Sequence, residues 1–74
     1  MLKSIAFEVV GDRRLACAGC EERVEDLLKP LQGVRKVRAR SSTQRIEVLF
    51  DAAVLDFGAI AERLRGAGYD TRVA

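Results

Sequence analysis

The sequence contains no histidine and only two cysteines, Cys17 and Cys20, among its 74 residues. A structural zinc site normally needs four nitrogen, sulfur or oxygen ligands from the protein. Carboxylates such as those of Asp12 or Glu21 would complete such a site poorly, because structural zinc is usually held by cysteine and histidine. This shortage of ligands argues against a structural zinc ion held by one chain.

Long apolar runs are also missing. No segment approaches the roughly 18 apolar residues that a membrane span requires. The first residues, MLKSIAFEVVGD, contain neither a long apolar stretch nor the small-residue cleavage site of a secretory signal. We therefore expect a cytoplasmic protein whose cysteines stay reduced. In that compartment a close cysteine pair indicates metal binding or catalysis more often than a structural disulfide.

The sequence has no strong excess of charge of either sign. Its 13 Lys and Arg residues and 11 Asp and Glu residues give a net charge of +2, too small to indicate nucleic-acid binding by itself. The charges are nevertheless grouped, and the simplest interpretation of each group is a solvated face. The acidic group could instead dock on a basic patch of a partner. The acidic residues are Glu21, Glu22, Glu25 and Asp26, and the basic ones are Arg35, Lys36, Arg38, Arg40 and Arg45.

Hydrophobic periodicity predicts a strand followed by a helix in the first half of the chain. Ile5, Phe7 and Val9 alternate with smaller or polar residues, as in a strand. From about Ala18 the apolar spacing becomes helical, and Pro30 falls where that helix should end. The apolar stripe of this helix consists of Val24, Leu27, Leu28 and Leu31.

The second half predicts a hairpin, a helix and a last strand. Residues 34–40 and 45–50 alternate in hydrophobicity, and the polar residues 41–44 join them as a hairpin turn. Asp56 is placed to cap a second helix, which the segment GAGYD ends before a short strand, YDTRV. The residues expected to face inward are Val37, Ala39, Ile46, Val48 and Phe50 in the hairpin, and Phe57, Ile60, Ala61 and Leu64 in the helix.

This order of elements, β-α-β-β-α-β, is that of the split-βαβ or ferredoxin-like arrangement. We expect an α+β fold in which two helices cover one face of a four-stranded antiparallel sheet. A chain of 74 residues is near the lower limit for a domain that folds alone. Residues 1–74 should therefore form a single domain, with its functional site at a loop rather than in a buried cavity.

The two cysteines lie where a loop enters the first predicted helix. The N-terminus of a helix carries partial positive charge and unpaired N–H groups, which stabilise a thiolate, the form that binds metals and attacks disulfides. Two thiolates suffice for a soft ion such as Cu(I) or Hg(II). Thiol–disulfide exchange is an alternative interpretation, and a third is that the pair has no role. The spacing, the position at a helix start and the lack of other cysteines favour a function.

Four motifs, taken in order along the chain, resemble those of the heavy-metal-associated domain. This is the ferredoxin-like fold of small copper chaperones and of the N-terminal domains of metal-pumping P-type ATPases. RLACAGC corresponds to the family's Gly-Met-x-Cys-x-x-Cys loop, and QGVRKV to its entry into the second strand. IEVLFD resembles the third strand of the family, and AGYDT its closing Gly-Tyr turn. The resemblance implies that Cys17 and Cys20 are the metal ligands.

The loop departs from the family's pattern, since Arg14 and Leu15 replace Gly-Met. Leu15 can still fill the apolar role of that methionine, packing beneath the loop as a core residue rather than a ligand. Ala16 stands where zinc- and cadmium-transporting relatives often carry a carboxylate, so the resemblance favours Cu(I). Tyr69 corresponds to a residue near the metal loop of bacterial copper chaperones. Its side chain could shield or hydrogen-bond the site, or it could simply bury its ring at the end of the sheet.

The resemblance implies a metal carrier rather than an enzyme, which passes its ion to the cysteine pair of a P-type ATPase or a similar acceptor. Cu(I) is the favoured ion, with Hg(II), Zn(II) and Cd(II) as alternatives. A thiol redox sensor is one rival interpretation. Another is an RNA-binding module, which would need exposed aromatic residues on the central strands. We expect neither nucleic-acid binding nor membrane insertion. The sequence leaves open whether the chain is a free-standing chaperone or a domain, and a monomer or a metal-bridged dimer.

Overall fold

A computed structural model describes all residues of the chain, 1–74. It contains four strands and two helices in the order that the hydrophobic periodicity predicts. Turns and short loops join successive elements, so that the elements fill most of the chain. Their bounds are Leu2–Val10 for β1, Ala18–Leu28 for α1, Val34–Arg40 for β2, Arg45–Asp51 for β3, Phe57–Gly66 for α2 and Asp70–Val73 for β4.

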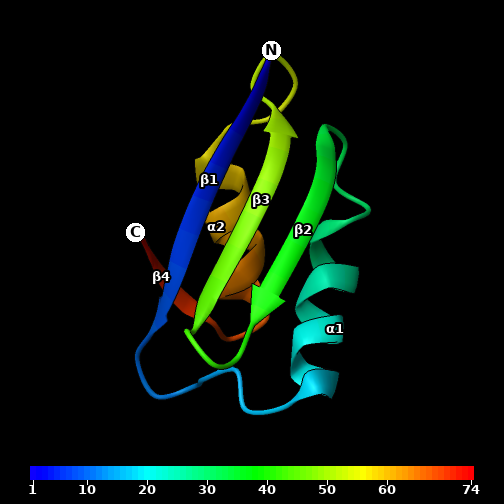
Figure 1. Cartoon of the computed structure of the whole chain (residues 1–74). Coiled ribbons are helices and arrows are strands. Elements are labelled where there is room, and N and C mark those ends of the chain that lie inside the picture. The colour runs from blue at the N-terminus through cyan, green and yellow to red at the C-terminus, as the bar shows by residue number, and fades with distance from the viewer.

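The four strands form one antiparallel sheet with the order β2-β3-β1-β4. Both helices lie against the same face of this sheet, and the other face is open (Figure 1). In the centre of the sheet, Phe7 of β1 is the partner of Ile46 of β3. This arrangement confirms the predicted ferredoxin-like α+β fold.

The hydrophobic core lies between the sheet and the two helices. It forms because alternate residues of each strand point to the helices, while the helices turn one apolar stripe to the sheet. All five inward-facing hairpin residues that the sequence predicts are buried. The thirteen core residues are Phe7, Val9, Leu15, Val24, Leu28, Val37, Ala39, Ile46, Val48, Phe50, Ile60, Leu64 and Tyr69.

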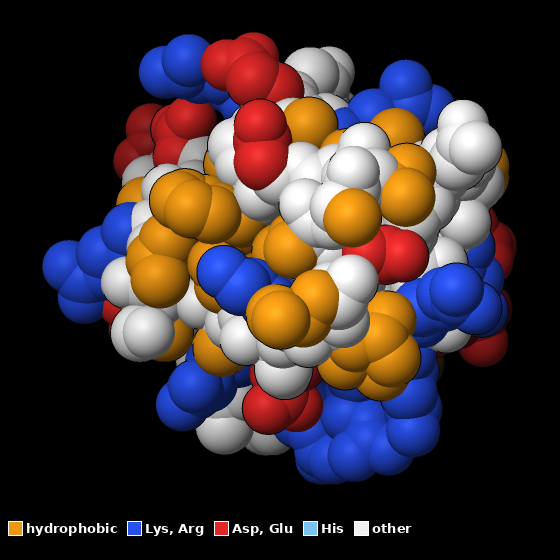
Figure 2. Space-filling model, turned by 90° about the horizontal axis from the view of Figure 1, so that it is seen from above, with side chains coloured by type: hydrophobic (Ala, Val, Ile, Leu, Met, Phe, Trp, Pro, Cys, Tyr) orange, Lys and Arg blue, Asp and Glu red, His pale blue; other side chains and the backbone are white.

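The prediction that Phe57 lies on the inner stripe of α2 is wrong, because 51% of its surface is exposed. Phe57 is the first residue of α2, where the helix begins beyond the edge of the core, and Asp56 caps it by accepting a hydrogen bond from the N–H of Ala59 at 2.8 Å. Its ring joins Met1, Leu2 and Val54 as exposed apolar side chains. Figure 2 shows apolar side chains gathered on this end of the molecule.

The first helix is also shorter than its predicted stripe. It ends at Leu28, because Pro30 lacks the N–H of a further helical turn and restricts the residue before it. Leu31 therefore lies beyond the helix, where it packs against the core and is only partly buried.

The last strand, β4, is the shortest element of the sheet. It pairs with only part of β1, from Phe7 to Val10, and leaves the first part of β1 without a partner on that side. The other outer strand, β2, pairs with β3 along its length and lies beside α1 (Figure 1).

Candidate metal centre

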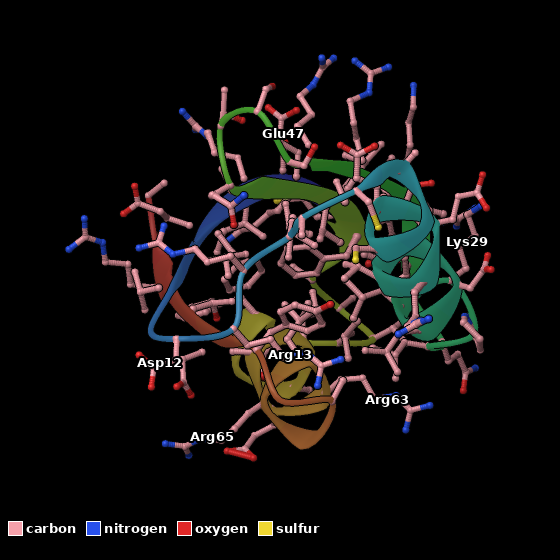
Figure 3. The ribbon with its side chains drawn as sticks, turned by 90° about the horizontal axis from the view of Figure 1, so that it is seen from below. Asp12, Arg13, Lys29, Glu47, Arg63 and Arg65 are labelled. Carbon is pink, nitrogen blue, oxygen red and sulfur yellow. The ribbon has the colours of Figure 1, made fainter.

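Both cysteines lie at the end of the molecule opposite the N-terminus. The loop between β1 and α1 crosses this end, close to the turn between β2 and β3 (Figures 1 and 3). Gly11 begins the loop with a φ of 82°, a left-handed conformation that suits glycine. Leu15 anchors the loop, since its side chain is 2% exposed and belongs to the core. The structure thus places Leu15 beneath the loop, as expected of a packing residue.

Cys17 is the N-cap of α1. Its backbone is extended, with a φ of −159°, and its carbonyl accepts hydrogen bonds from the N–H groups of Cys20 and Glu21, both at 3.1 Å. Its Sγ also accepts a hydrogen bond from the N–H of Cys20, at 3.4 Å. The thiol of Cys17 therefore occupies the place that a serine or aspartate oxygen usually takes at a helix start.

The sulfur atoms of Cys17 and Cys20 lie 3.0 Å apart and share a hydrogen bond. Both cysteines are free thiols; Cys17 is exposed, whereas Cys20 is partly buried against the core. The two residues between them, Ala18 and Gly19, are small and leave the sulfur atoms unobstructed. A metal–sulfur bond is about 2.3 Å long in zinc thiolate sites, so one ion between the two sulfurs needs a wider separation than 3.0 Å. The exposed side chain of Cys17 has the freedom to supply it.

The surroundings of Cys20 favour its thiolate. The hydrogen bond with the side chain of Cys17 lowers the pKa of the Cys20 thiol most, followed by a backbone hydrogen bond from Ala16. The positive charge of Arg23 lowers this pKa further, while partial burial opposes the shift. A lowered pKa helps metal binding, because the thiolate is the form that coordinates.

The donor set at this site consists of two sulfur atoms. No group of three or more His, Cys, Asp or Glu residues comes together in a way that could hold a metal ion. Glu21, which could have completed a zinc site, instead accepts a hydrogen bond from the backbone N–H of Ser41 at 2.6 Å. Asp12 lies on the outside of the loop (Figure 3).

Tyr69 is buried at the end of the core beside the loop, with 2% of its surface exposed. The guanidinium of Arg13 stacks over its ring, 4.9 Å from the ring centre. The same arginine lies across Gly68, where an added Cβ would be 3.0 Å from Arg13 Nη1. Gly68 also has a φ of 96°, so its lack of a side chain serves both the turn and the arginine. Tyr69 therefore contacts the loop between β1 and α1 through Arg13, which Figure 3 labels, and its role toward a metal ion stays a prediction.

Two contacts of the loop that carries Cys17 were not predicted. Arg13 stacks on Tyr69, and Gln44 of the β2–β3 turn hydrogen-bonds to Leu15. The sequence alone identifies Gln44 only as the last residue of the polar turn 41–44. A contact between residues 29 positions apart has no local signal in a single sequence.

Residues 13–70 match the heavy-metal-associated domain. The chain belongs to the heavy-metal-associated domain family. The matched segment begins in the loop before Cys17 and ends at the first residue of β4, so it contains the whole candidate site.

This heavy-metal-associated domain is 34% identical, over 68 residues, to copper-transporting ATPase 2 of Rhizobium meliloti (strain 1021). That alignment covers 92% of this chain but only 8% of the ATPase, so the chain spans a small part of the curated relative. No helix of the domain is long and apolar enough to cross a membrane.

Two solved structures illustrate the range of similar domains. The copper-binding domain of HMA7, a P-type ATPase, is 28% identical with a TM-score of 0.85, and the alignment covers 96% of this chain and 92% of that one. The N-terminal domain of the zinc(II) ATPase ziaa, in its apo form, is 27% identical with a TM-score of 0.81, and both chains are covered completely, at 100%. The fold is thus shared with domains of ATPases that are named for different metals.

Proposed function

We propose that this domain binds one Cu(I) ion between the thiolates of Cys17 and Cys20 and passes it to a partner's cysteine pair. The observation that carries the proposal is the pair of sulfur atoms 3.0 Å apart at the start of α1, without a third ligand beside them. Soft thiolate ligands select Cu(I), which accepts two of them, whereas zinc in proteins is usually four-coordinate. The name of the Rhizobium relative, a copper-transporting ATPase, supports the same ion.

The unequal exposure of the two cysteines suits transfer of the ion. Cys17 is exposed at the surface of the loop, while Cys20 packs against the core. An incoming thiolate of the partner would add to the ion from the open side, giving a three-coordinate intermediate. Departure of one of the domain's thiolates then shifts the ion toward the partner. This is an exchange of ligands in which the oxidation state of copper does not change, so the domain acts as a carrier and not as an enzyme.

The partner is proposed to be a metal-transporting P-type ATPase or a similar acceptor with its own cysteine pair. The ATPase relative supports this class of partner. Residues 1–74 would act as a single cytoplasmic metal-binding domain, either as a free chaperone or as part of a longer chain, and as a monomer or a metal-bridged dimer.

Zinc(II) is the second candidate ion. It is favoured by the similarity to the domain of the zinc(II) ATPase ziaa. Because this site offers two sulfurs, a zinc ion would need further ligands from water or from a partner. Two thiolates can also bind Hg(II) or Cd(II), and a reversible disulfide would be the sign of a redox sensor.

The test is a titration of the fully reduced protein with Cu(I) in the presence of a competing chromophoric chelator, repeated with Zn(II). We expect one Cu(I) per chain, bound far more tightly than Zn(II). The variants Cys17→Ser and Cys20→Ser should each lose tight binding while keeping the circular dichroism spectrum of the folded domain. Full Cu(I) affinity in Cys20→Ser, or tighter binding of Zn(II) than of Cu(I) by the unaltered chain, would contradict the proposal.

A further inference from the structure

The side chain of Gln44 connects the β2–β3 turn to the loop that carries Cys17. Its Oε1 accepts a hydrogen bond from the backbone N–H of Leu15 at 2.9 Å, and its Nε2 donates to the carbonyl of Leu15 at 2.6 Å. Nε2 also donates to the carbonyl of Ser41 at 2.7 Å, within its own turn. One amide side chain therefore satisfies both backbone groups of a residue two positions before Cys17.

The backbone of Gln44 holds the beginning of the same loop segment. Its carbonyl accepts a hydrogen bond from the N–H of Val9, near the end of β1, at 2.8 Å. The residues on either side of segment 10–14, Val9 and Leu15, are thus both hydrogen-bonded to Gln44. The turn between β2 and β3 therefore holds the loop between β1 and α1, which leads to Cys17 (Figure 1).

Gln44 adopts an uncommon backbone conformation to do this. Its φ is 55°, and it is the only residue other than glycine with a positive φ in the chain. A side chain with a Cβ is disfavoured in this left-handed region. Such a conformation persists where surrounding interactions determine it, and it is found often at binding sites. Here the interactions are the three side-chain hydrogen bonds to Leu15 and Ser41.

We propose that Gln44 is a positioning residue for the metal site. By fixing both backbone groups of Leu15, it holds Cys17 in the place from which its sulfur faces that of Cys20. The buried side chain of Leu15 anchors the loop inward, and Gln44 fixes its backbone direction. This inference rests on the proposed binding of Cu(I). When the backbone before Cys17 is fixed before the ion arrives, only the side chain of Cys17 has to adjust, so less conformational freedom is lost on binding.

The substitution Gln44→Gly removes the side-chain hydrogen bonds to Leu15 and is expected to leave the domain folded. Glycine adopts a φ of 55° without strain, so relief of the left-handed backbone offsets part of the lost hydrogen bonding and the domain remains folded. Gln44→Asn keeps the amide and also tolerates this conformation, but it is one methylene too short to reach Leu15 as glutamine does. Thr43→Ala, at an exposed neighbour in the same turn, is the matched control.

Two measurements test the proposal. The first is hydrogen exchange of the Leu15 amide in the metal-free protein, which should accelerate about tenfold in Gln44→Gly and Gln44→Asn, the ratio that corresponds to the loss of one ordinary hydrogen bond. The second is the dissociation constant for Cu(I), which should rise by about threefold to tenfold in the same variants. Thr43→Ala should match the unaltered protein in both, and the circular dichroism spectra should show that all variants are folded.

Faster exchange of Leu15 together with weaker Cu(I) binding would support the positioning role. Unchanged exchange of Leu15, or faster exchange with unchanged Cu(I) affinity, would overturn it. If the unaltered chain binds no Cu(I), the proposed function fails, and the positioning of the metal site fails with it. The exchange of Leu15 then still reports whether Gln44 holds the loop, so the two failures are distinguishable.

Discussion

The side chain of Glu25 on α1 accepts a hydrogen bond from the backbone N–H of Ala39 on β2, at 3.1 Å. One helical turn earlier, Glu21 accepts a hydrogen bond from the N–H of Ser41 at 2.6 Å. Because β2 is an outer strand, the N–H of Ala39 has no strand to pair with on that side, and Ser41 is the first residue after this strand. Two carboxylates of the acidic group thus fasten the helix that carries Cys20 to the edge of the sheet, instead of belonging only to a solvated face.

Acid should weaken this attachment. The hydrogen bond from the N–H of Ser41 is the largest cause that lowers the pKa of Glu21 below its ordinary value of 4.5, followed by a hydrogen bond from the Ser41 side chain. A carboxylate whose pKa is lower in the folded state stabilises the fold above its unfolded pKa, and this contribution is lost as the pH falls through the folded value. In urea unfolding of the metal-free protein, Glu21→Gln should be less stable than the unaltered chain at pH 6. This difference should shrink as the pH falls below 4.5 and through the lowered pKa that Glu21 has in the folded state.

The matched control for this experiment is Glu22→Gln. Glu22 is exposed and forms no hydrogen bond with the sheet, so its substitution should leave the pH dependence of the urea midpoint unchanged. A Glu21→Gln protein with the pH profile of the unaltered chain would show that the contact with Ser41 contributes nothing to stability.

Because Cys17 is the N-cap of α1, substitutions at this position can differ in their effect on stability while both remove a metal ligand. Serine is among the preferred N-cap residues and alanine is not, a difference of about 1 kcal/mol. We expect metal-free Cys17→Ser to be more stable than Cys17→Ala by about this amount, although both variants lose tight Cu(I) binding. Thermal unfolding of the two metal-free variants measures the difference. Equal melting temperatures would mean that the side chain at position 17 does not cap α1.

The stacking of Arg13 on Tyr69 should stabilise the loop region modestly. The contact is 4.9 Å long and lies at the surface, where such cation–π interactions contribute about 0.5–1 kcal/mol. Arg13→Ala should lower the free energy of unfolding by this amount, whereas Tyr69→Phe, which keeps the aromatic face, should preserve the contact. Arg14→Ala removes an equal charge from the next residue and serves as the control in the same urea titration.

Two apolar residues of α2 should differ greatly in their contribution to stability. Leu64 is completely buried and Phe57 is 51% exposed. Leu64→Ala should destabilise the domain by about 2–5 kcal/mol, because it removes buried methyl groups and leaves a cavity. Phe57→Ala should change the free energy of unfolding by no more than about 0.5 kcal/mol. Chemical denaturation of both variants measures the two free energies of unfolding. A larger loss of stability in Phe57→Ala than in Leu64→Ala would contradict the exposed position of Phe57.

The sequence predicts the elements well because each one carries its own periodicity. The alternation in the hairpin identifies Val37 and Val48 as buried, and Asp56 marks the start of α2. The cysteine pair is equally visible, since both residues lie within one helical turn. The exposure of Phe57 was not predictable from the stripe alone, because it depends on where the core ends rather than on helical spacing.

The contacts that orient the site are of another kind. Glu21 meets Ser41, and Gln44 meets Leu15, across 20 and 29 positions of the chain. These pairs exist only after the helix and the hairpin turn have been brought together by the packing of the core. A single sequence shows each residue as an ordinary polar surface residue, and nothing in its neighbours along the chain identifies its partner.

The short length of β4 affects the tendency of the protein to aggregate at high concentration. Beyond the stretch that pairs with β4, the backbone of β1 from Leu2 to Ile5 runs along an open margin of the sheet. Unpaired backbone groups on such a margin can recruit a strand from another molecule, which is the usual beginning of aggregation in sheet proteins, and natural proteins oppose it with short open stretches and lysine side chains. This stretch is short and includes Lys3. The open stretch of this strand and the cysteines thus lie at opposite ends of the sheet, so a change that protects the open stretch need not touch the metal site.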